Sequence, residues 1–197
     1  MLFSKVFTGL AMASTAMAAL TPQQLADGIK SLTQKSQRLQ APAQSITIVN
    51  APLIVIGQGP FPVLIAGFAD IVATATSLAA QFPGTAPITK RDEQEHARDL
   101  SPRGAGADLV FNAFRDFVRV HQALLNILIG KAGILTRIPF VGPPVAGALR
   151  GIEGVVDATA IFLINTIEVR ANDFASEANA LGATITITIE KYDGLQL

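Results

Sequence analysis

The stretch Val55-Ile-Gly-Gln-Gly-Pro-Phe-Pro-Val63 places two glycines and two prolines inside one of the most apolar regions of the chain, residues 43–82. A membrane-spanning helix would carry this interruption into lipid, where each unpaired backbone amide or carbonyl costs roughly several kcal/mol. A nucleotide-binding loop would need a third glycine and free backbone amides, and Pro60 and Pro62 remove two of those amides. The stretch therefore predicts a corner between packed helices, and we do not expect an integral membrane protein.

Helical periodicity extends from this corner in both directions. Downstream, apolar side chains recur every three or four residues and predict a helix over 61–81: Leu64, Phe68, Ile71, Ala75 and Leu78. Upstream we favour a helix over 43–57, although its many β-branched residues leave a strand as the alternative. Further upstream, Thr21 and Pro22 suit the N-cap and first residue of an amphipathic helix that ends near Pro42.

The second half of the chain repeats this organisation. Apolar spacing predicts helices over 108–131 and 144–180, separated by a second Gly/Pro-rich break at 132–147. Small residues follow a Gly-Pro step at both breaks, so a weak internal duplication is one explanation and independent helix-corner chemistry is the other. Residues 183–192, in which Thr and Ile alternate, predict a strand, with a final turn or two of helix as the alternative.

These elements predict an all-α protein, an antiparallel bundle of about four to five amphipathic helices with Gly/Pro corners. Half of the 197 residues are apolar, so residues 19–197 are expected to form a single domain around one sizeable core. Charged, Pro and Gly residues at 83–105 predict an exposed polar loop. Within it, Lys90 and Arg91 form a dibasic pair that is either a processing site for secretory-pathway proteases or an ordinary solvated pair.

The first 18 residues have the pattern of a secretory signal peptide. Lys5 precedes a short apolar run, and Ala16 and Ala18 are spaced as in an A-x-A cleavage site. The apolar run is too short to span a bilayer. The mature chain is therefore expected to begin at Ala19 and to be secreted.

Composition excludes several classes of function. The 15 basic and 15 acidic residues cancel, so we expect no basic face for binding nucleic acid. The chain has no cysteine, which removes disulfides, thiolate metal ligands, redox motifs and cysteine nucleophiles. The core must therefore hold without covalent cross-links.

Two histidines are the remaining candidates for chemistry. His96 lies beside Glu93, Glu95 and Asp99 in the polar loop, where charged residues are more commonly solvated than bound to a metal. His121 lies on the apolar face of its helix, as expected of a core histidine with satisfied hydrogen bonds. No G-x-S-x-G nucleophile elbow is present in the sequence. We therefore predict no catalytic residues, no metal and no cofactor.

The helix corners carry apolar residues that would suit contact with an apolar surface. Six of them are candidate surface contacts: Ile56, Phe61, Val63, Ile138, Phe140 and Val141. The alternative is that these six side chains belong to the ordinary core. Apolar residues that point inward would indicate a lipid-binding cavity, whereas apolar residues at exposed corners would indicate adsorption to a surface.

Four features of the sequence suggest a family. They are the signal peptide, the mature opening TPQQLADGIKSLTQKSQRLQAPAQSI at 21–46, the apolar helices that follow, and the Ile-Glu-Lys-Tyr ending at 189–192. Together they resemble the fungal hydrophobic surface-binding protein A family, also described as cell-wall galactomannoproteins. Residues 34–46 and 51–63 are also similar to the ultraviolet-induced UVI type of small secreted fungal protein.

This resemblance implies a secreted or wall-associated helical bundle that adsorbs to hydrophobic surfaces, recruits hydrolytic enzymes there and has no catalytic residues of its own. The leading hypothesis is accordingly a secreted, non-catalytic protein that binds hydrophobic surfaces or cell-wall material. The alternative is a secreted carrier of a lipid or another apolar small molecule, held between the helices. A secreted enzyme or a membrane-damaging effector ranks below both.

Overall fold

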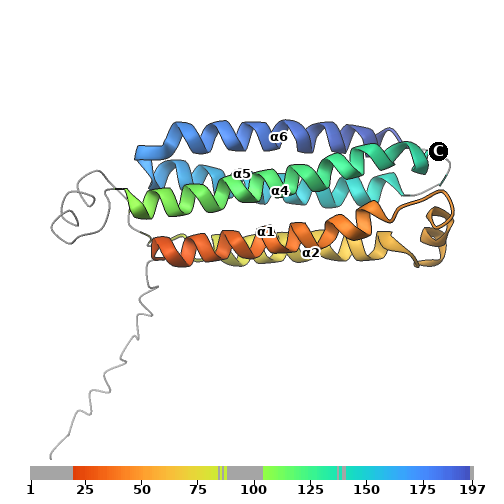
Figure 1. The fold of residues 1–197 in the computed structure, drawn as a ribbon, viewed down its shortest axis with the longest axis horizontal. Helices are drawn as coiled ribbons and strands as arrows, with labels where there is room; N and C mark the ends of the chain where they lie inside the picture. The colour runs from red at the N-terminus through yellow and green to blue at the C-terminus, as the bar shows by residue number, and fades with distance from the viewer. Residues whose placement is uncertain are drawn as a thin grey trace, which may run out of the picture.

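The computed structural model of the chain describes residues 20–83, 85, 87, 104–136, 138 and 141–195. The described residues form five long helices and contain no strand. These helices lie along one common axis (Figure 1). The helical elements are, in chain order, α1 (Pro22–Gln44), η1 (Ala51–Ile56), α2 (Pro60–Ala79), α4 (Ala105–Leu135), α5 (Gly142–Thr166), η3 (Glu168–Arg170) and α6 (Ala171–Asp193). The predicted all-α bundle is therefore confirmed.

Each long helix packs against two others. α1 contacts α2 and α4, α4 also contacts α6, α6 contacts α5, and α5 contacts α2. The five helices therefore close into a ring around a shared interior. Successive helices run in opposite directions along the bundle, as the colour gradient of Figure 1 shows. Neighbours that are distant in sequence, such as α1 and α4, consequently run in the same direction.

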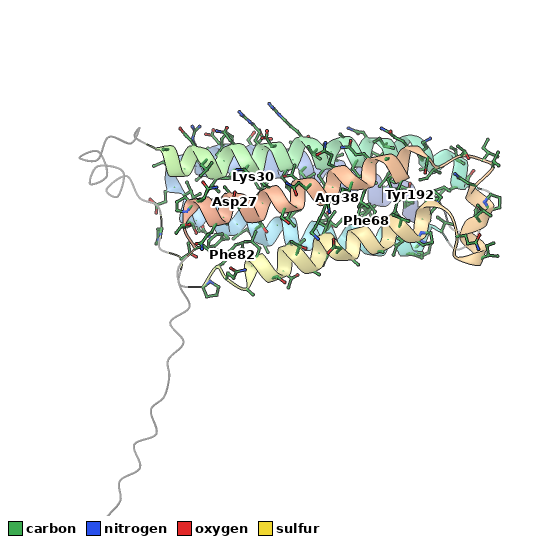
Figure 2. The ribbon with its side chains drawn as sticks, turned by 60° about the horizontal axis from the view of Figure 1, so that its bottom comes forward. Asp27, Lys30, Arg38, Phe68, Phe82 and Tyr192 are labelled. Atoms are coloured by element: carbon green, nitrogen blue, oxygen red, sulfur yellow. The ribbon has the colours of Figure 1, made fainter. Side chains whose placement is uncertain are left out.

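The predicted apolar stripes form the interior of this ring. The apolar residues that recur at helical spacing along 144–180, with their continuation at Leu181, are all buried: Val145, Leu149, Ile152, Val156, Leu163, Ile167, Phe174 and Leu181. Figure 2 shows Phe68 between the helices, where none of its surface is exposed, whereas Asp27 and Lys30 lie on the outer face of α1. Burial of these apolar stripes is the main source of stability for a bundle without disulfides.

Ion pairs on the outside of the bundle connect neighbouring helices. Lys35 of α1 pairs with Asp70 of α2, and Arg150 of α5 pairs with Asp193 of α6. Exposed pairs of this kind contribute about 1 kcal/mol or less. They therefore support the arrangement of the helices without determining it.

α1 and α2 approach each other closely through glycine. At Gly67 of α2, an added Cβ atom would overlap the side chain of Leu39 on α1. At Gly28 of α1, an added Cβ atom would overlap Leu78 of α2. Each leucine thus fills the space that a glycine leaves on the facing helix, which fixes the register of the two helices.

The start of α1 is the one that the sequence predicts. The Thr21 hydroxyl accepts a hydrogen bond from the Gln24 amide at 3.2 Å, and the Gln24 side chain accepts one from the Thr21 amide at 2.9 Å. This capping box satisfies two amides that the first turn leaves unpaired. The helix passes the predicted end at Pro42 and continues to Gln44, because a proline in the last turn removes only one hydrogen bond.

The predicted helix over 43–57 is wrong. α1 instead ends in a turn that is closed by the side chain of Asn50, which accepts a hydrogen bond from the Thr47 amide at 2.8 Å and donates one to the Ser45 carbonyl at 2.6 Å. The short 3-10 helix η1 follows this turn. Asn side chains commonly close turns in this way, at the expense of a continuous helix.

The Gly/Pro stretch after η1 is a helix corner, as predicted. Gly57 and Gly59 have φ angles of 71° and 85°, in the left-handed region that glycine adopts without strain. α2 then begins at Pro60, whose fixed φ suits the first turn of a helix. The second break likewise precedes a helix, α5, which begins at Gly142.

The predicted long helix over 144–180 is two helices. α5 ends at Thr166, Ile167 leaves the helical conformation with φ −120° and ψ 68°, and α6 begins at Ala171 after η3. The sequence around this break contains neither Gly nor Pro. Because the Ile167 side chain is buried, the apolar periodicity also continues through the break and conceals it.

The predicted strand at 183–192 is wrong, and the helical alternative is correct. The buried residues of this segment follow a helical spacing: Leu181, Ile185, Thr188, Ile189 and Tyr192. The Thr hydroxyls that suggested a strand donate instead to carbonyls four residues earlier, at 2.7–3.1 Å: Thr184, Thr186 and Thr188. Packing against α4 and α5 therefore overrides the β propensity of the sequence.

Candidate functional site

An apolar cavity lies inside the ring of helices. Its lining comes from four of the five long helices: Ile29, Leu32, Ile71, Ala75, Phe114, Phe117, Val155, Val156 and Thr159. The cavity volume is about 10 Å³, roughly the space that one water molecule requires. A longer apolar molecule would therefore have to separate the helices as it binds.

The side chains that line the cavity are almost entirely hydrocarbon. Thr159 contributes the one hydroxyl among the lining residues, and this hydroxyl donates to the Val155 carbonyl of its own helix at 2.8 Å. The lining contains no charged side chain. Such a site favours alkyl chains and offers no group that could activate a substrate.

A buried polar pair lies one helical turn from this cavity. Ser36 of α1 and His121 of α4 are both fully buried, and the Ser36 hydroxyl oxygen lies 2.8 Å from Nδ1 of His121. Burial lowers the pKa of His121 to about 4, so the imidazole is neutral at physiological pH. The sequence correctly predicted a buried histidine, but Nε2 has no hydrogen-bond partner among the described residues.

The six candidate surface contacts do not form one exposed surface. Ile56 and Val63 are exposed, at 66% and 52%, but Phe61, Ile138 and Val141 are buried at 7% or less, so their prediction as surface contacts is wrong. Phe140 lies outside the described residues. Phe61 is buried because it lies one helical turn before Leu64 on the inward face of α2.

The corner between α1 and α2 instead exposes apolar residues that sequence reasoning missed. Ile48, Val49 and Leu53 are 78%, 89% and 39% exposed and lie near Ile56 and Val63 in the chain. We call these five residues the apolar corner. The signal that could have identified it is the absence of any charged residue from 39 to 69.

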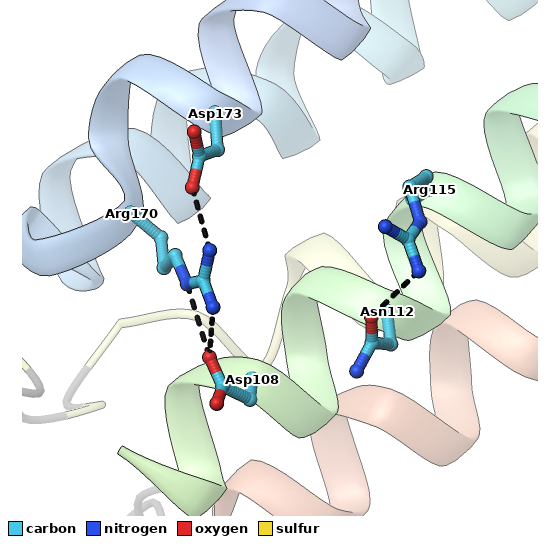
Figure 3. Close-up of polar contacts among 5 residues, drawn as sticks. All are labelled: Asp108, Asn112, Arg115, Arg170 and Asp173. Atoms are coloured by element: carbon cyan, nitrogen blue, oxygen red, sulfur yellow. Dashed lines mark hydrogen bonds and ion pairs between the residues drawn. The ribbon is translucent and has the colours of Figure 1, made fainter.

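The polar contacts at the opposite end of the bundle are structural. Figure 3 shows Arg170 between Asp173, which accepts a hydrogen bond at 2.8 Å, and Asp108 of α4. Hydrogen bonds to Asp173 and Asp108 raise the pKa of Arg170 above its usual value. Its guanidinium also lies 5.1 Å from the centre of the Phe111 ring. Arg170 therefore holds the turn between α5 and α6 against α4.

Several predicted features lie outside the described residues. They are the signal peptide at 1–18, the dibasic pair Lys90 and Arg91, and the acidic residues around His96. Within the described part of the chain, no group of His, Asp and Glu side chains could hold a metal ion.

One described helix is long and apolar enough to cross a membrane. It is α2, whose most apolar window of 18 residues has a mean hydropathy of 1.7, and 33% of this window is buried in the bundle. The core helix of a soluble protein meets the same criteria of length and composition. α2 contacts both α1 and α5, as a member of the closed ring.

No family model and no curated protein matches the sequence. Among solved structures, AfMP4p in complex with palmitic acid is similar, with a TM-score of 0.68 and 13% identity over 87% of this chain and 99% of that chain. Ligand-binding domains 1 and 2 of the Penicillium marneffei MP1 protein, both complexed with arachidonic acids, are also similar. Domain 1 has a TM-score of 0.64 and 12% identity over 86% of this chain and 95% of that chain. Domain 2 has a TM-score of 0.65 and 12% identity over 87% of this chain and 93% of that chain. The chain therefore has the helical fold of these ligand-binding proteins.

Proposed function

We propose that the chain is a carrier of a single-chain lipid, such as a fatty acid, whose alkyl chain lies inside the ring of helices. The apolar cavity, lined from α1, α2, α4 and α5, is the observation that carries this proposal. The shared fold supports it, because the similar structures hold palmitic or arachidonic acid. An alkyl chain in this apolar cavity would be removed from contact with water, which is the main driving force for binding it.

The test is a titration of the purified mature chain with a fluorescent fatty acid, followed by displacement with palmitic acid. Ala75→Leu fills the cavity and should raise the dissociation constant roughly tenfold or more, since an alkyl chain would then overpack the interior at a cost of about 1–3 kcal/mol. Ala73→Leu is the matched control, because Ala73 lies two residues away on the exposed face of α2. No uptake by the unmodified chain, and no lipid in its native mass spectrum, would exclude the proposal.

A second candidate function is adsorption to hydrophobic surfaces, as the sequence resemblance implies. The apolar corner supports it, since five large apolar side chains are exposed on an uncharged stretch of the chain. Replacing Ile48, Val49 and Ile56 with Ser should abolish adsorption to hydrophobic beads. A wild-type chain that stays in solution in the presence of such beads would contradict this candidate.

Both candidates include secretion, absence of catalysis and a location outside the membrane. Secretion rests on the signal-peptide pattern of residues 1–18, and it is tested by the N-terminal sequence of the protein recovered from the culture medium. Absence of catalysis rests on the apolar lining of the cavity and on the Ser36–His121 pair beside it, in which no carboxylate of the described residues is hydrogen-bonded to the imidazole to orient it as a base. The membership of the hydrophobic surface-binding protein A family stays a prediction.

A further inference from the structure

The Ser36–His121 pair leaves one buried polar atom without a partner. A neutral imidazole carries one proton, so one ring nitrogen donates and the other accepts. The Ser36 hydroxyl, whose oxygen lies 2.8 Å from Nδ1, can either donate a hydrogen bond to Nδ1 or accept one from it. Nε2 is then left with either a proton to donate or a lone pair to share, and it has no partner among the described residues.

The position of this pair relates it to the cavity. Ser36 follows Leu32 by four residues on α1, and His121 follows Phe117 by four residues on α4, so each lies one turn further along the same helix face. Leu32 and Phe117 both line the cavity. The imidazole also stacks on the Phe117 ring, with centroids 5.4 Å apart and planes inclined by 29°. The polar pair therefore lies at one end of the cavity lining.

The direction of the free nitrogen is set by the shape of the ring. Nδ1 and Nε2 are separated by one carbon atom and point to opposite sides of the imidazole. Because Nδ1 is directed at Ser36, Nε2 is directed away from α1. A purely structural role does not explain this arrangement, since buried polar atoms are nearly always hydrogen-bonded and an apolar side chain would fill the same space.

We infer that Nε2 of His121 forms a hydrogen bond to the polar head of a single-chain lipid, either a carboxylic acid or an alcohol, whose alkyl chain occupies the neighbouring cavity. This inference rests on the proposed carrier function and adds the class of head group. A carboxylic acid or a hydroxyl both donates and accepts, so it complements either tautomer of the imidazole. A carboxylate is complementary to the tautomer in which the Ser36 hydroxyl donates to Nδ1 and Nε2 carries the proton.

The first test compares dodecanoic acid with undecane, the same alkyl chain without its head group. His121→Phe keeps an aromatic ring beside Phe117 and removes Nε2, so the dissociation constant of dodecanoic acid should rise roughly tenfold or more. The dissociation constant of undecane should change less than about threefold. Thr188→Val is the matched control, because it removes a buried hydroxyl on α6 that donates to its own helix at 2.7 Å.

The second test needs no variant in the lipid-binding region and remains decisive if His121→Phe does not fold. The chain has only two histidines, so a ¹⁵N-histidine spectrum contains two imidazoles, which His96→Gln assigns. Dodecanoic acid should shift the Nε2 resonance of His121, whereas undecane should leave it unchanged. Binding of both ligands without a shift at Nε2 would overturn the head-group site and leave the carrier function intact. Binding of neither ligand would overturn the carrier function itself.

Discussion

At the scale of single residues, the buried imidazole of His121 is a titratable group that is fully removed from water. The ring has no exposed surface, and no charged side chain is hydrogen-bonded to it in the described part of the chain. Desolvation therefore acts on the charged form without compensation and lowers the pKa to about 4, from 6.5 in an unfolded chain. Between pH 6.5 and pH 4, His121 is therefore mostly neutral in the folded protein and mostly protonated in the unfolded chain.

This difference in pKa makes stability depend on pH. Well above pH 6.5 the imidazole is neutral in both states, and as the pH falls toward 4 the unfolded state takes up the proton while the folded state remains mostly neutral. The His121 contribution to the free energy of unfolding should therefore fall by roughly 2–3 kcal/mol between pH 7 and pH 4.5. Urea unfolding of the wild type and of His121→Phe at both pH values measures it. Equal losses in the two proteins would contradict the lowered pKa.

Gly142 shows how closely backbone segments pack where α5 begins. A Cβ atom at this position would overlap the carbonyl oxygen of Tyr192, a backbone atom that cannot rotate away. Gly142→Ala should therefore lower the free energy of unfolding by roughly 1–3 kcal/mol. Gly154→Ala on the same helix has no atom within 4 Å of the added carbon and should stabilise the protein by up to about 1 kcal/mol. Thermal unfolding of the two variants should thus shift in opposite directions.

At the scale of elements, the sequence predicted those boundaries that local chemistry sets. The capping residue Thr21 and the helix-starting Pro60 are recognisable without any tertiary contact. The break at Ile167 was not predictable, because it lacks Gly and Pro and is held by contacts with α4. Whether an apolar corner residue points inward or outward was also not predictable. Phe61 is buried and Val63 is exposed, although they are only two residues apart in α2.

The turn between α5 and α6 should depend on Arg170. This side chain bonds Asp108 and Asp173 and lies over the Phe111 ring. Arg170→Ala should lower the free energy of unfolding by roughly 1–2 kcal/mol, and high salt should reduce the effect. Arg119→Ala, at an exposed position of α4, should change it by less than about 0.5 kcal/mol. Urea unfolding at low and high salt distinguishes the two, and equal effects would show that Arg170 does not hold the turn.

At the scale of the whole molecule, the closed ring and the narrow cavity constrain how a ligand arrives. A cavity of about 10 Å³ cannot accept an alkyl chain without outward movement of helices. Uptake should therefore be limited by opening of the bundle rather than by diffusion.

The lining of the cavity was predictable only in part. Apolar stripes in the sequence identify the inward face of each helix. They do not show which helices lie next to one another around the ring, and so they could not place the cavity.

Stopped-flow mixing with a fluorescent fatty acid should reveal this opening step. The observed rate should rise with fatty acid concentration and then level off at the opening rate. Ala75→Leu should lower the affinity, whereas Ala73→Leu should leave both rate and affinity unchanged. A rate that rises linearly to the diffusion limit would indicate a cavity that is open before the ligand arrives.

The order of helices around the ring predicts that the bundle stays together when the covalent link between α2 and α4 is cut. α1 packs on α4, and α2 packs on α5, so both interfaces between the first two helices and the last three are independent of that link. A chain cut after Arg91 should therefore remain one particle, and residues 19–91 and 92–197 produced separately should reassemble when mixed. Their melting temperature should then rise with concentration, as in any bimolecular complex. Proteolysis at the dibasic pair would convert a single folded chain into a two-chain protein whose lifetime depends on dilution.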